Sequence, residues 1–254
     1  MQVTFLEASN GQRLSKHHSP TKGFTPYPHV KNVTSHEENI LLDATGISML
    51  EQLIRRHADR GHCLLKGDLK RKLDNESRAG KTNRVAYNNL LVLDIDGVTL
   101  PGHTNPKTYT DTDVSVLAKA VMRELPPEVQ DCSFIAQASA SLGLKGDKVF
   151  ILLSHAMPAK AMKLWLQSCN FESKLFSSQL ELSSNGHSLK YPLDVSVADN
   201  SKLIFIAPPT FEDGTYDPFS SSSERVVRVS GISETLDLAK LMNDISPEVV
   251  HQKS

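Results

Sequence analysis

Short apolar runs along this chain are separated by segments in which apolar residues recur every three or four positions. The runs predict buried strands. The clearest of them lie at residues 62–65, 90–93, 133–137, 148–153, 203–207 and 226–229. The helical spacing predicts three main helices, because each follows a capping residue or proline, and the first two end at a glycine or proline. They begin near Asp43 or Thr45, at 110–112 and at Pro158. This alternation predicts an α/β fold.

The polar pattern divides the chain into three parts. Residues 1–42 are rich in His, Pro, Ser and Thr, and apart from a short strand at 3–6 we expect an irregular N-terminal arm. We expect residues 43–230 to form the main domain, with a helix and basic loop at 43–89 and a strand-rich core at 90–212. Residues 231–254 are predicted to form a C-terminal helix, capped near Ser233, and a tail.

Composition excludes several classes of protein. With 28 basic and 29 acidic residues the net charge is −1, which argues against nucleic-acid binding over the whole surface but leaves room for a local basic channel. No apolar stretch is long enough to cross a bilayer, and we expect no membrane partner. The three scattered cysteines and the absence of a signal-peptide core at the N-terminus predict a cytoplasmic protein.

The segment LLVLDIDGV at 90–98 places two acids at the end of an apolar strand. In a strand, residues i and i+2 point to the same side, so Asp94 and Asp96 can face one cation. Oxygen ligands select hard ions, which predicts Mg²⁺ or Mn²⁺. Acids at strand ends also serve as turn starters or helix caps, but two such neighbours repel each other unless a cation or base compensates.

Two further segments carry residues suited to phosphate. The span 66–84 is basic and nearly free of large apolar residues; such a run is often only a solvated loop, but this one leads directly into the acidic strand. The loop 137–148 combines small hydroxyls and glycines with lysines, which can cradle phosphates, although such loops are also common hairpin connections. Asp194 is a candidate third carboxylate ligand for a metal held by Asp94 and Asp96.

The order of three segments resembles the catalytic core of the archaeo-eukaryotic primase superfamily, in particular the primase-polymerase domains of phages, plasmids and integrated elements. These segments are LLVLDIDGV, SASLGLKGDKVFILL and LDVSVADNSKLIFIAPP, and the likeness extends over about residues 27–212, including the basic segment CLLKGDLKRKLDNESRAGKT. The resemblance implies an α/β catalytic core with a mixed or antiparallel, RRM-like sheet flanked by helices, plus a smaller N-terminal α/β segment.

The resemblance also implies residue roles. The carboxylates of Asp94, Asp96 and Asp194 would be catalytic and hold two Mg²⁺ or Mn²⁺ ions. The nucleotide would be bound by Ser139, Ser141, Lys145, Lys148 and Lys202, and DNA by Lys66, Arg78, Lys81 and Arg84. Where the family usually has His, this chain has Lys148, or Asp147 if the loop aligns one residue differently. We prefer Lys148, because a cation attracts a triphosphate and Asp would repel it.

The implied activity is template-dependent nucleotidyl transfer in phage or mobile-element replication, that of a DNA primase or primase-polymerase. Its partners would be a single-stranded DNA template, NTP or dNTP, and a replicative helicase. This chain has no phosphate loop of the Gly-x4-Gly-Lys-Ser/Thr type, so unwinding would come from elsewhere.

Two alternatives remain open at this point. The segment DIDGVTL also fits the first motif of haloacid-dehalogenase-type phosphatases, with Asp94 as nucleophile and Asp96 as general acid/base. That motif normally lies near the start of its domain, whereas here a helix and a basic loop precede it. The second alternative is a catalytically inactive, single-stranded-DNA-binding relative of the primases, for which the missing histidine is the support.

Overall fold

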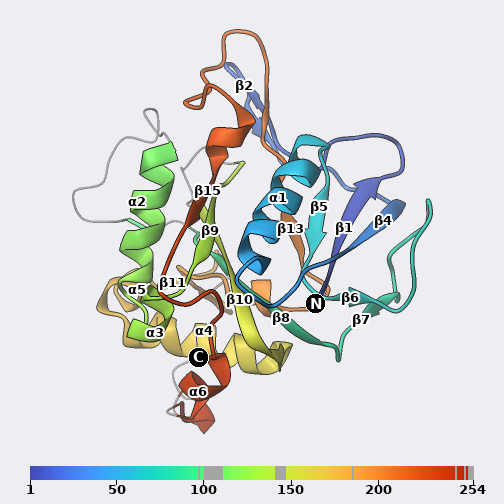
Figure 1. Ribbon diagram of the computed structural model, residues 1–254. Helices are drawn as coiled ribbons and strands as arrows, with labels where there is room; N and C mark the ends of the chain where they lie inside the picture. Colours follow the sequence, from blue (N-terminus) through green and yellow to red (C-terminus); the bar gives the residue numbers. More distant parts are fainter. Residues whose placement is uncertain are drawn as a thin grey trace.

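Two four-stranded antiparallel sheets form the framework of the computed structural model (Figure 1). The model describes residues 1–96, 98–99, 111–140, 147–184, 186–243, 245–248 and 250, with 111–113 described by their backbone. The N-terminal sheet has the order β13-β5-β1-β4, with bounds Leu203–Phe205, Cys63–Leu65, Gln2–Ala8 and Val33–Asn39. The central sheet has the order β15-β9-β10-β8, with bounds Val226–Val229, Phe134–Ala138, Asp147–Pro158 and Tyr87–Asp94.

Three smaller sheets lie outside this framework. One has the order β14-β2-β3, and the other two are the pairs β6–β7 and β11–β12. The β14–β2 pair is parallel, and the other pairs are antiparallel. Their bounds are Thr210–Phe211, His17–Ser19, Gly23–Thr25, Asp68–Leu69, Thr82–Asn83, Glu181–Leu182 and Leu189–Lys190. The α/β class predicted from the sequence is confirmed, and of the mixed or antiparallel sheet that was expected, the central sheet is antiparallel.

Helices cover the central sheet. The helices α1 and α2 contact β15, β9 and β10, whereas α4 contacts β8 and β10. Their bounds are Gly46–Asp59 for α1, Asp111–Met122 for α2, Pro127–Gln130 for α3, Ala159–Glu172 for α4, Lys174–Ser177 for α5 and Leu238–Met242 for α6. Two 3₁₀ turns, η2 and η3, span Val195–Ala198 and Ser222–Arg225. No helix in the described part of the chain is both long and apolar enough to cross a membrane.

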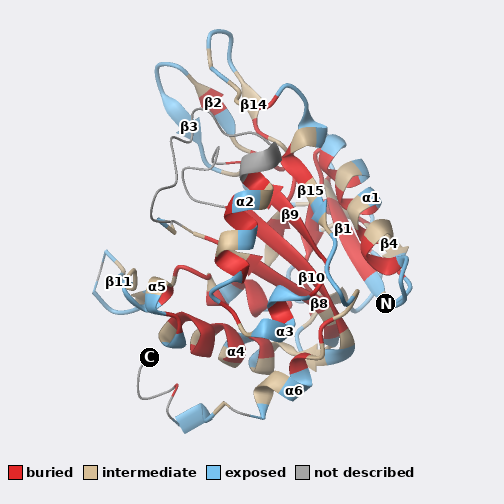
Figure 2. Ribbon diagram, turned by 60° about the vertical axis from the view of Figure 1, so that its left-hand side comes forward, coloured by how far each residue is buried: buried red, intermediate tan, exposed pale blue. Residues whose placement is uncertain are grey.

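The middle strands of the central sheet are buried on both faces (Figure 2). Val92 of β8 lies opposite Phe150 of β10, which lies opposite Ile135 of β9, and all three side chains are fully buried. The neighbouring row, which begins at Leu93, faces the other side and is equally buried. Burial of both faces explains why these strands appear in the sequence as continuous apolar runs rather than as alternating patterns.

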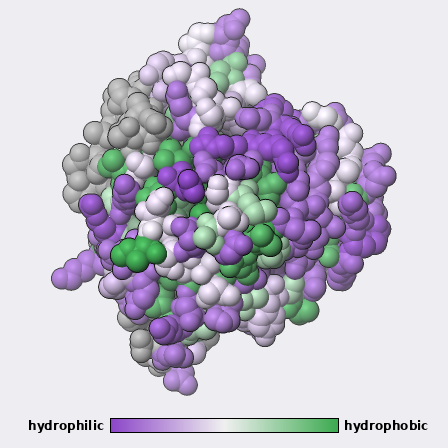
Figure 3. Space-filling model, in the orientation of Figure 1, coloured by the Kyte–Doolittle hydropathy of each residue, from purple (hydrophilic) through white to green (hydrophobic). Residues whose placement is uncertain are grey.

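The predicted arm at 1–42 is wrong, because much of it is regular structure. The strand β1 lies in the interior of the N-terminal sheet, and β4 pairs with it along its whole length, from Gln2 opposite Asn39 to Ala8 opposite Val33. The sequence of β4, VTSHEEN, contains one large apolar residue, so its pattern does not predict a strand. Figure 3 shows hydrophilic residues over the right-hand side of the molecule, where β1 and β4 lie in Figure 1.

The predicted helices and core strands are otherwise confirmed with small shifts in their ends. The first helix ends as predicted, because Gly61 adopts the left-handed conformation, with φ +83°, and turns the chain into β5. The C-terminal helix differs from prediction. Its cap is Asp237, whose side chain accepts from the backbone N–H of Lys240, whereas the carbonyl of Ser233 accepts a bond from the Ser133 backbone instead.

Candidate functional site

Asp94 ends the edge strand of the central sheet, directly opposite a lysine. The β8–β10 register pairs it with Lys148, which in turn lies opposite Gln137 of β9. Directly opposed residues share a face of the sheet. The Nζ atom of Lys148 stands 3.5 Å from Oδ1 of Asp94, and the lysine is buried. Of the two residues that the sequence left open, Lys148 therefore faces the acid.

The structure places the backbone of Asp194 beside that of Asp94. The N–H of Asp194 donates to the carbonyl oxygen of Asp94 at 2.9 Å, and the N–H of Asp96 donates to the carbonyl oxygen of Pro192 at 2.8 Å. Between these bonds, Ile95 and Leu193 form an isolated antiparallel bridge. The three predicted acids thus come from two adjacent backbone segments at the edge of the central sheet.

The carboxylate of Asp194 is engaged within its own loop. It caps η2 by accepting from the backbone N–H and the hydroxyl of Ser196, at 2.8 and 2.7 Å, and it lies 3.2 Å from Nζ of Lys202. Partial burial raises the pKa of Asp194, but the hydrogen bonds from Ser196 and the charge of Lys202 outweigh it, so the pKa is lowered overall. Asp194 is therefore negatively charged at neutral pH.

The three carboxylates do not form a compact cluster. In the described part of the chain, the oxygens of Asp94, Asp96 and Asp194 do not all lie within 4.8 Å of one another. Lysines accompany two of them, since Lys148 pairs with Asp94 and Lys202 with Asp194. The prediction that the three acids hold metal ions together stays a prediction.

A cavity of about 300 Å³, here called the Asp94 cavity, lies at the end of β8. Its polar lining contains Asp94, Asp96, Ser139, Lys148 and Lys202, which the sequence predicted for the site, together with Lys16 and Tyr27, which it did not. Gln137, next to Lys148, links the sheets by donating to the carbonyl oxygen of Ile206 at 2.7 Å. The nucleotide-site residues Ser141 and Lys145 lie outside the described residues.

Burial changes the acidity of groups around this cavity. Burial alone lowers the pKa of Lys148, but the negative charge of Asp94 and other neighbours outweighs it, so the pKa is raised overall. Burial raises the pKa of Tyr27; the charge of Lys148 opposes this rise and that of Asp94 adds to it. Lys148 is therefore cationic and Tyr27 neutral at physiological pH. Tyr27 comes from a polar stretch whose pattern carries no signal for a site.

A second cavity, of about 960 Å³ and here called the Asp194 cavity, adjoins the first at a shared residue. Asp96 lines both, whereas Asp194 lines only the larger one. Lys163 of α4 and Lys190 of β12 add basic side chains to its wall. Asp96 is thus the acid with access to both spaces.

The basic segment lines a third cavity, of about 630 Å³, here called the Arg78 cavity. Arg78, Arg84, Lys31 and Lys70 contribute its basic side chains. Leu203 and Phe205 of β13 line both this cavity and the Asp94 cavity. The strand β13 therefore adjoins the acidic site and the basic site.

The predicted DNA-contacting residues differ in their surroundings. Arg78 donates to the carbonyl oxygen of Ser201 at 2.9 Å and to the hydroxyl of Thr82 at 3.2 Å. Lys81 is half-buried and paired with Glu76, and Arg84 lines the Arg78 cavity.

Lys66 lies in the interior, where a contact with DNA is not supported. Its side chain is 1 % exposed, and its ammonium stands 3.6 Å from Sδ of Met162. Burial lowers its pKa to about 7. The basic pattern of the sequence does not reveal this, because a lysine in a charged run is ordinarily solvated.

Comparisons with known proteins give one distant relative. In an alignment 188 residues long, which covers 68 % of this chain, the sequence is 29 % identical to a protein of Escherichia phage T5 named "Putative replication origin binding protein". The chain is similar to one part of that protein. The aligned stretch covers 18 % of the phage protein's length. No protein-family model matches the chain. No solved structure matches it.

Proposed function

We propose that this chain is a primase-polymerase domain of phage or mobile-element replication, which transfers nucleotides under the direction of a single-stranded DNA template. The observation that carries the proposal is the hydrogen bond between the backbones of Asp94 and Asp194, because it brings acids from distant parts of the chain to one edge of the central sheet. The similarity to a phage protein named for replication-origin binding supports the setting.

The donors at the site are of the type that divalent cations require. Asp94 and Asp96 offer carboxylate oxygens to one cavity, and the space beside them can admit water and phosphate oxygens, which complete the coordination of Mg²⁺ or Mn²⁺. Asp94, Asp96 and Asp194 would hold two ions. When bound, these ions supply a lowered pKa for the attacking 3′ hydroxyl and neutralise charge on the departing pyrophosphate.

The lysines of the Asp94 cavity would bind the triphosphate. Lys16, Lys148 and Lys202 line the same space, and Ser139 adds a hydroxyl that can donate to a phosphate oxygen. Lys148 is held cationic by Asp94, so it can attract a polyanion at neutral pH. When a nucleotide is bound, the ammonium of Lys148 would interact with both the carboxylate of Asp94 and the phosphates.

The Arg78 cavity would contact the template backbone. Its basic side chains suit phosphate, and its wall is continuous with the Asp94 cavity through Leu203 and Phe205. Contacts of this kind position the strand without selecting its sequence, which base pairing with the incoming nucleotide would read. A replicative helicase partner would supply the unwinding.

A direct assay tests the proposal. The purified chain is incubated with single-stranded DNA, labelled nucleotides and Mg²⁺ or Mn²⁺, and the products are separated by length. We expect labelled oligonucleotides or extended primers from the unaltered chain and none from Asp96→Asn. Failure of the unaltered chain to incorporate nucleotides, across templates and both metals, would overturn the assignment.

A second candidate function is single-stranded DNA binding without catalysis. It is favoured by the two lysine–carboxylate pairs, since Asp94 and Asp194 already have cationic partners within the protein. The same assay separates the candidates, because binding without synthesis identifies the inactive module. Phosphate release from a generic phosphate ester would identify the phosphatase alternative, in which Asp94 is the nucleophile.

A further inference from the structure

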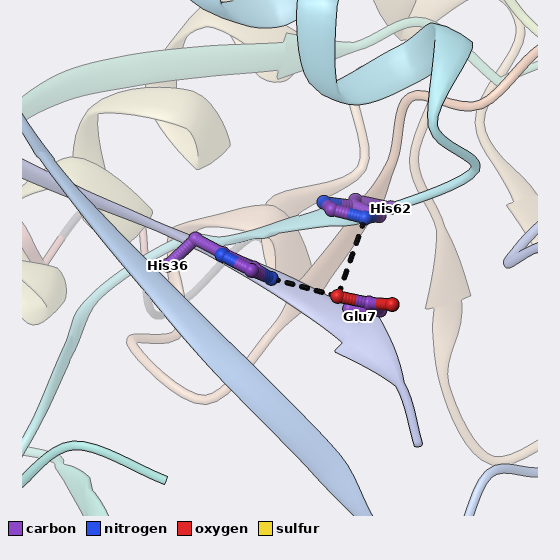
Figure 4. Close-up of side chains that lie close together, drawn as sticks. All are labelled: Glu7, His36 and His62. Carbon is purple, nitrogen blue, oxygen red and sulfur yellow. Dashed lines mark hydrogen bonds and ion pairs between the residues drawn. The ribbon is translucent and has the colours of Figure 1, made fainter. Parts of the chain in front are cut away.

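Two histidines and a glutamate meet on the N-terminal sheet, outside the three cavities described above. Glu7 lies on β1, His36 on β4, and His62 directly before β5 (Figure 4). The Oε2 atom of Glu7 stands 2.9 Å from Nε2 of His36 and 3.8 Å from Nε2 of His62. One potential ligand atom from each residue lies within 4.8 Å of the other two.

The strand register explains why these side chains converge. Phe5 lies opposite His36, so His36 shares a face with Phe5 and with Glu7, which is two residues further along β1. On the other side of β1, Leu6 lies opposite Cys63, which places His62 across from Glu7 on that same face. Three adjacent strands therefore present one ligand atom each to a common point.

A chain of hydrogen bonds defines which nitrogen of His62 is available. His57 of α1 stacks on Phe5 with ring centroids 3.8 Å apart, and its Nε2 lies 3.4 Å from a carboxylate oxygen of Glu38. Donation from Nε2 to Glu38 leaves Nδ1 of His57 as an acceptor, 2.9 Å from Nδ1 of His62. His62 then carries its proton on Nδ1, and the lone pair on its Nε2 faces Glu7.

This arrangement contains both direct ligands and an outer hydrogen-bond partner, as metal sites do. Both His57 and His62 are buried, and His57 bonds to the Nδ1 atom of His62 on the side away from Glu7. Neutral imidazole is the form that binds metals, and an outer hydrogen bond to the other ring nitrogen commonly orients it. Arg56 pairs with Glu38 and not with Glu7, so the Glu7 carboxylate remains beside the two imidazoles.

We propose that Glu7, His36 and His62 form a Zn²⁺ site that ties β1, β4 and the start of β5 together. Two imidazoles and one carboxylate are a preferred ligand set for zinc. Tetrahedral zinc with bonds of about 2.0–2.2 Å needs ligand atoms roughly 3.3–3.6 Å apart, between the two Glu7–His distances given above. The fourth position is left to water, because the side chains of Glu7 and His36 are 44 % and 33 % exposed.

Zinc binding would change the tautomer of His36. Without the ion, Nε2–H of His36 can donate to Glu7; with it, the lone pair on Nε2 binds the metal and the single proton of the neutral ring lies on Nδ1 instead. The competing explanation is a hydrogen-bonded His–Glu cluster that needs no metal. The site is independent of the proposed nucleotidyl transfer, and neither result depends on the other.

Zinc affinity of the full chain tests the proposal. After treatment with a chelator, the protein is titrated with Zn²⁺ against a chromophoric competitor, and metal content is measured by mass spectrometry. The test variants are Glu7→Gln and His36→Gln, which keep side-chain size while removing a charge or an imidazole. The controls are His155→Gln, whose exposed histidine lies outside the cluster, and Asp96→Asn, which excludes binding at the acidic site.

We expect one tightly bound Zn²⁺ per chain in the unaltered protein and in both controls, apart from any weaker binding at the acidic site, and at least tenfold weaker tight binding in both test variants. Zinc at a hundredfold excess over Kd should raise the unfolding temperature by roughly 5–10 °C in the unaltered chain, and far less in the test variants. Substitution with Co²⁺ should give the visible absorption of a tetrahedral site. Absence of stoichiometric binding, or equal affinity in Glu7→Gln, would establish the hydrogen-bonded cluster and overturn the zinc site.

Discussion

Lys148 lies directly opposite Asp94 across the β8–β10 pair, with its ammonium 3.5 Å from the carboxylate. Under the proposed function, this lysine would stand where the primase family usually carries histidine. Its charge is permanent at neutral pH, whereas that of a histidine is not. A metal ion that enters this cavity would therefore share Asp94 with Lys148, whereas a triphosphate would share Lys148 with Asp94.

Asp96 offers the cleanest test of the acidic site, because no ion pair with a described residue involves it and it lines both adjoining cavities. We expect Asp96→Asn to lower nucleotide incorporation at least about a hundredfold, since a lost ligand weakens the metal on which the transition state depends. The Kd for single-stranded DNA should stay within about twofold. The measurement combines primer extension with fluorescence anisotropy. Asp213→Asn, at an exposed acid, is the control, and wild-type incorporation by Asp96→Asn would remove Asp96 from the site.

Removal of the Asp94 carboxylate should also destabilise the fold. In Asp94→Asn the buried ammonium of Lys148 loses its charge partner, which we expect to lower the free energy of unfolding by about 1–3 kcal/mol, allowing for partial solvent screening of Asp94. Urea denaturation measures the change. Addition of Lys148→Met should restore most of the loss, because it removes the unpaired charge. A double variant no more stable than Asp94→Asn would show that the pair is not coupled.

Arg78 is expected to contribute to DNA binding through its charge. In Arg78→Ala the affinity for single-stranded DNA should fall several-fold, and the dependence of log K on log salt should become shallower by about one ion. Arg78 also bonds to Ser201 and Thr82, so the substitution can loosen the loop. Arg78→Lys separates the two effects because it keeps the charge, and it should keep most of the salt dependence. Equal salt dependence in Arg78→Ala and in Lys240→Ala, an exposed lysine on α6, would exclude Arg78 from the interface.

We expect the buried Lys66 to lower the free energy of unfolding rather than to bind DNA. Its pKa is lowered to about 7 by burial, so the unfolded chain binds the proton more strongly than the folded chain between that value and 10.5. Stability should therefore rise with pH across this window. In Lys66→Met the penalty disappears, and we expect a gain of about 2–4 kcal/mol at pH 7 that shrinks toward pH 10. Denaturation at several pH values measures it, and reduced DNA affinity in Lys66→Met would contradict the interior placement.

Local pattern was sufficient for the central sheet and the main helices. The strand β9, the part of β10 up to Leu153 and most of β8 are buried on both faces, so their apolar runs reveal them without knowledge of their partners. The spacing of Asp94 and Asp96 follows from strand geometry alone, and both acids do line one cavity. Gly61 likewise marks the end of α1 through its own backbone conformation.

Tertiary structure decided what depends on pairing between distant segments. The polar strand β4 is held by backbone bonds to β1, which leave no trace in hydropathy. Only the folded chain shows that Lys66 is buried, or that His36 and His62 meet at Glu7. A sequence specifies periodicity within a segment, whereas register between segments arises from packing of the whole chain. Most helices and strands of this protein could therefore be predicted from its sequence, whereas the neighbours of its charged groups could not.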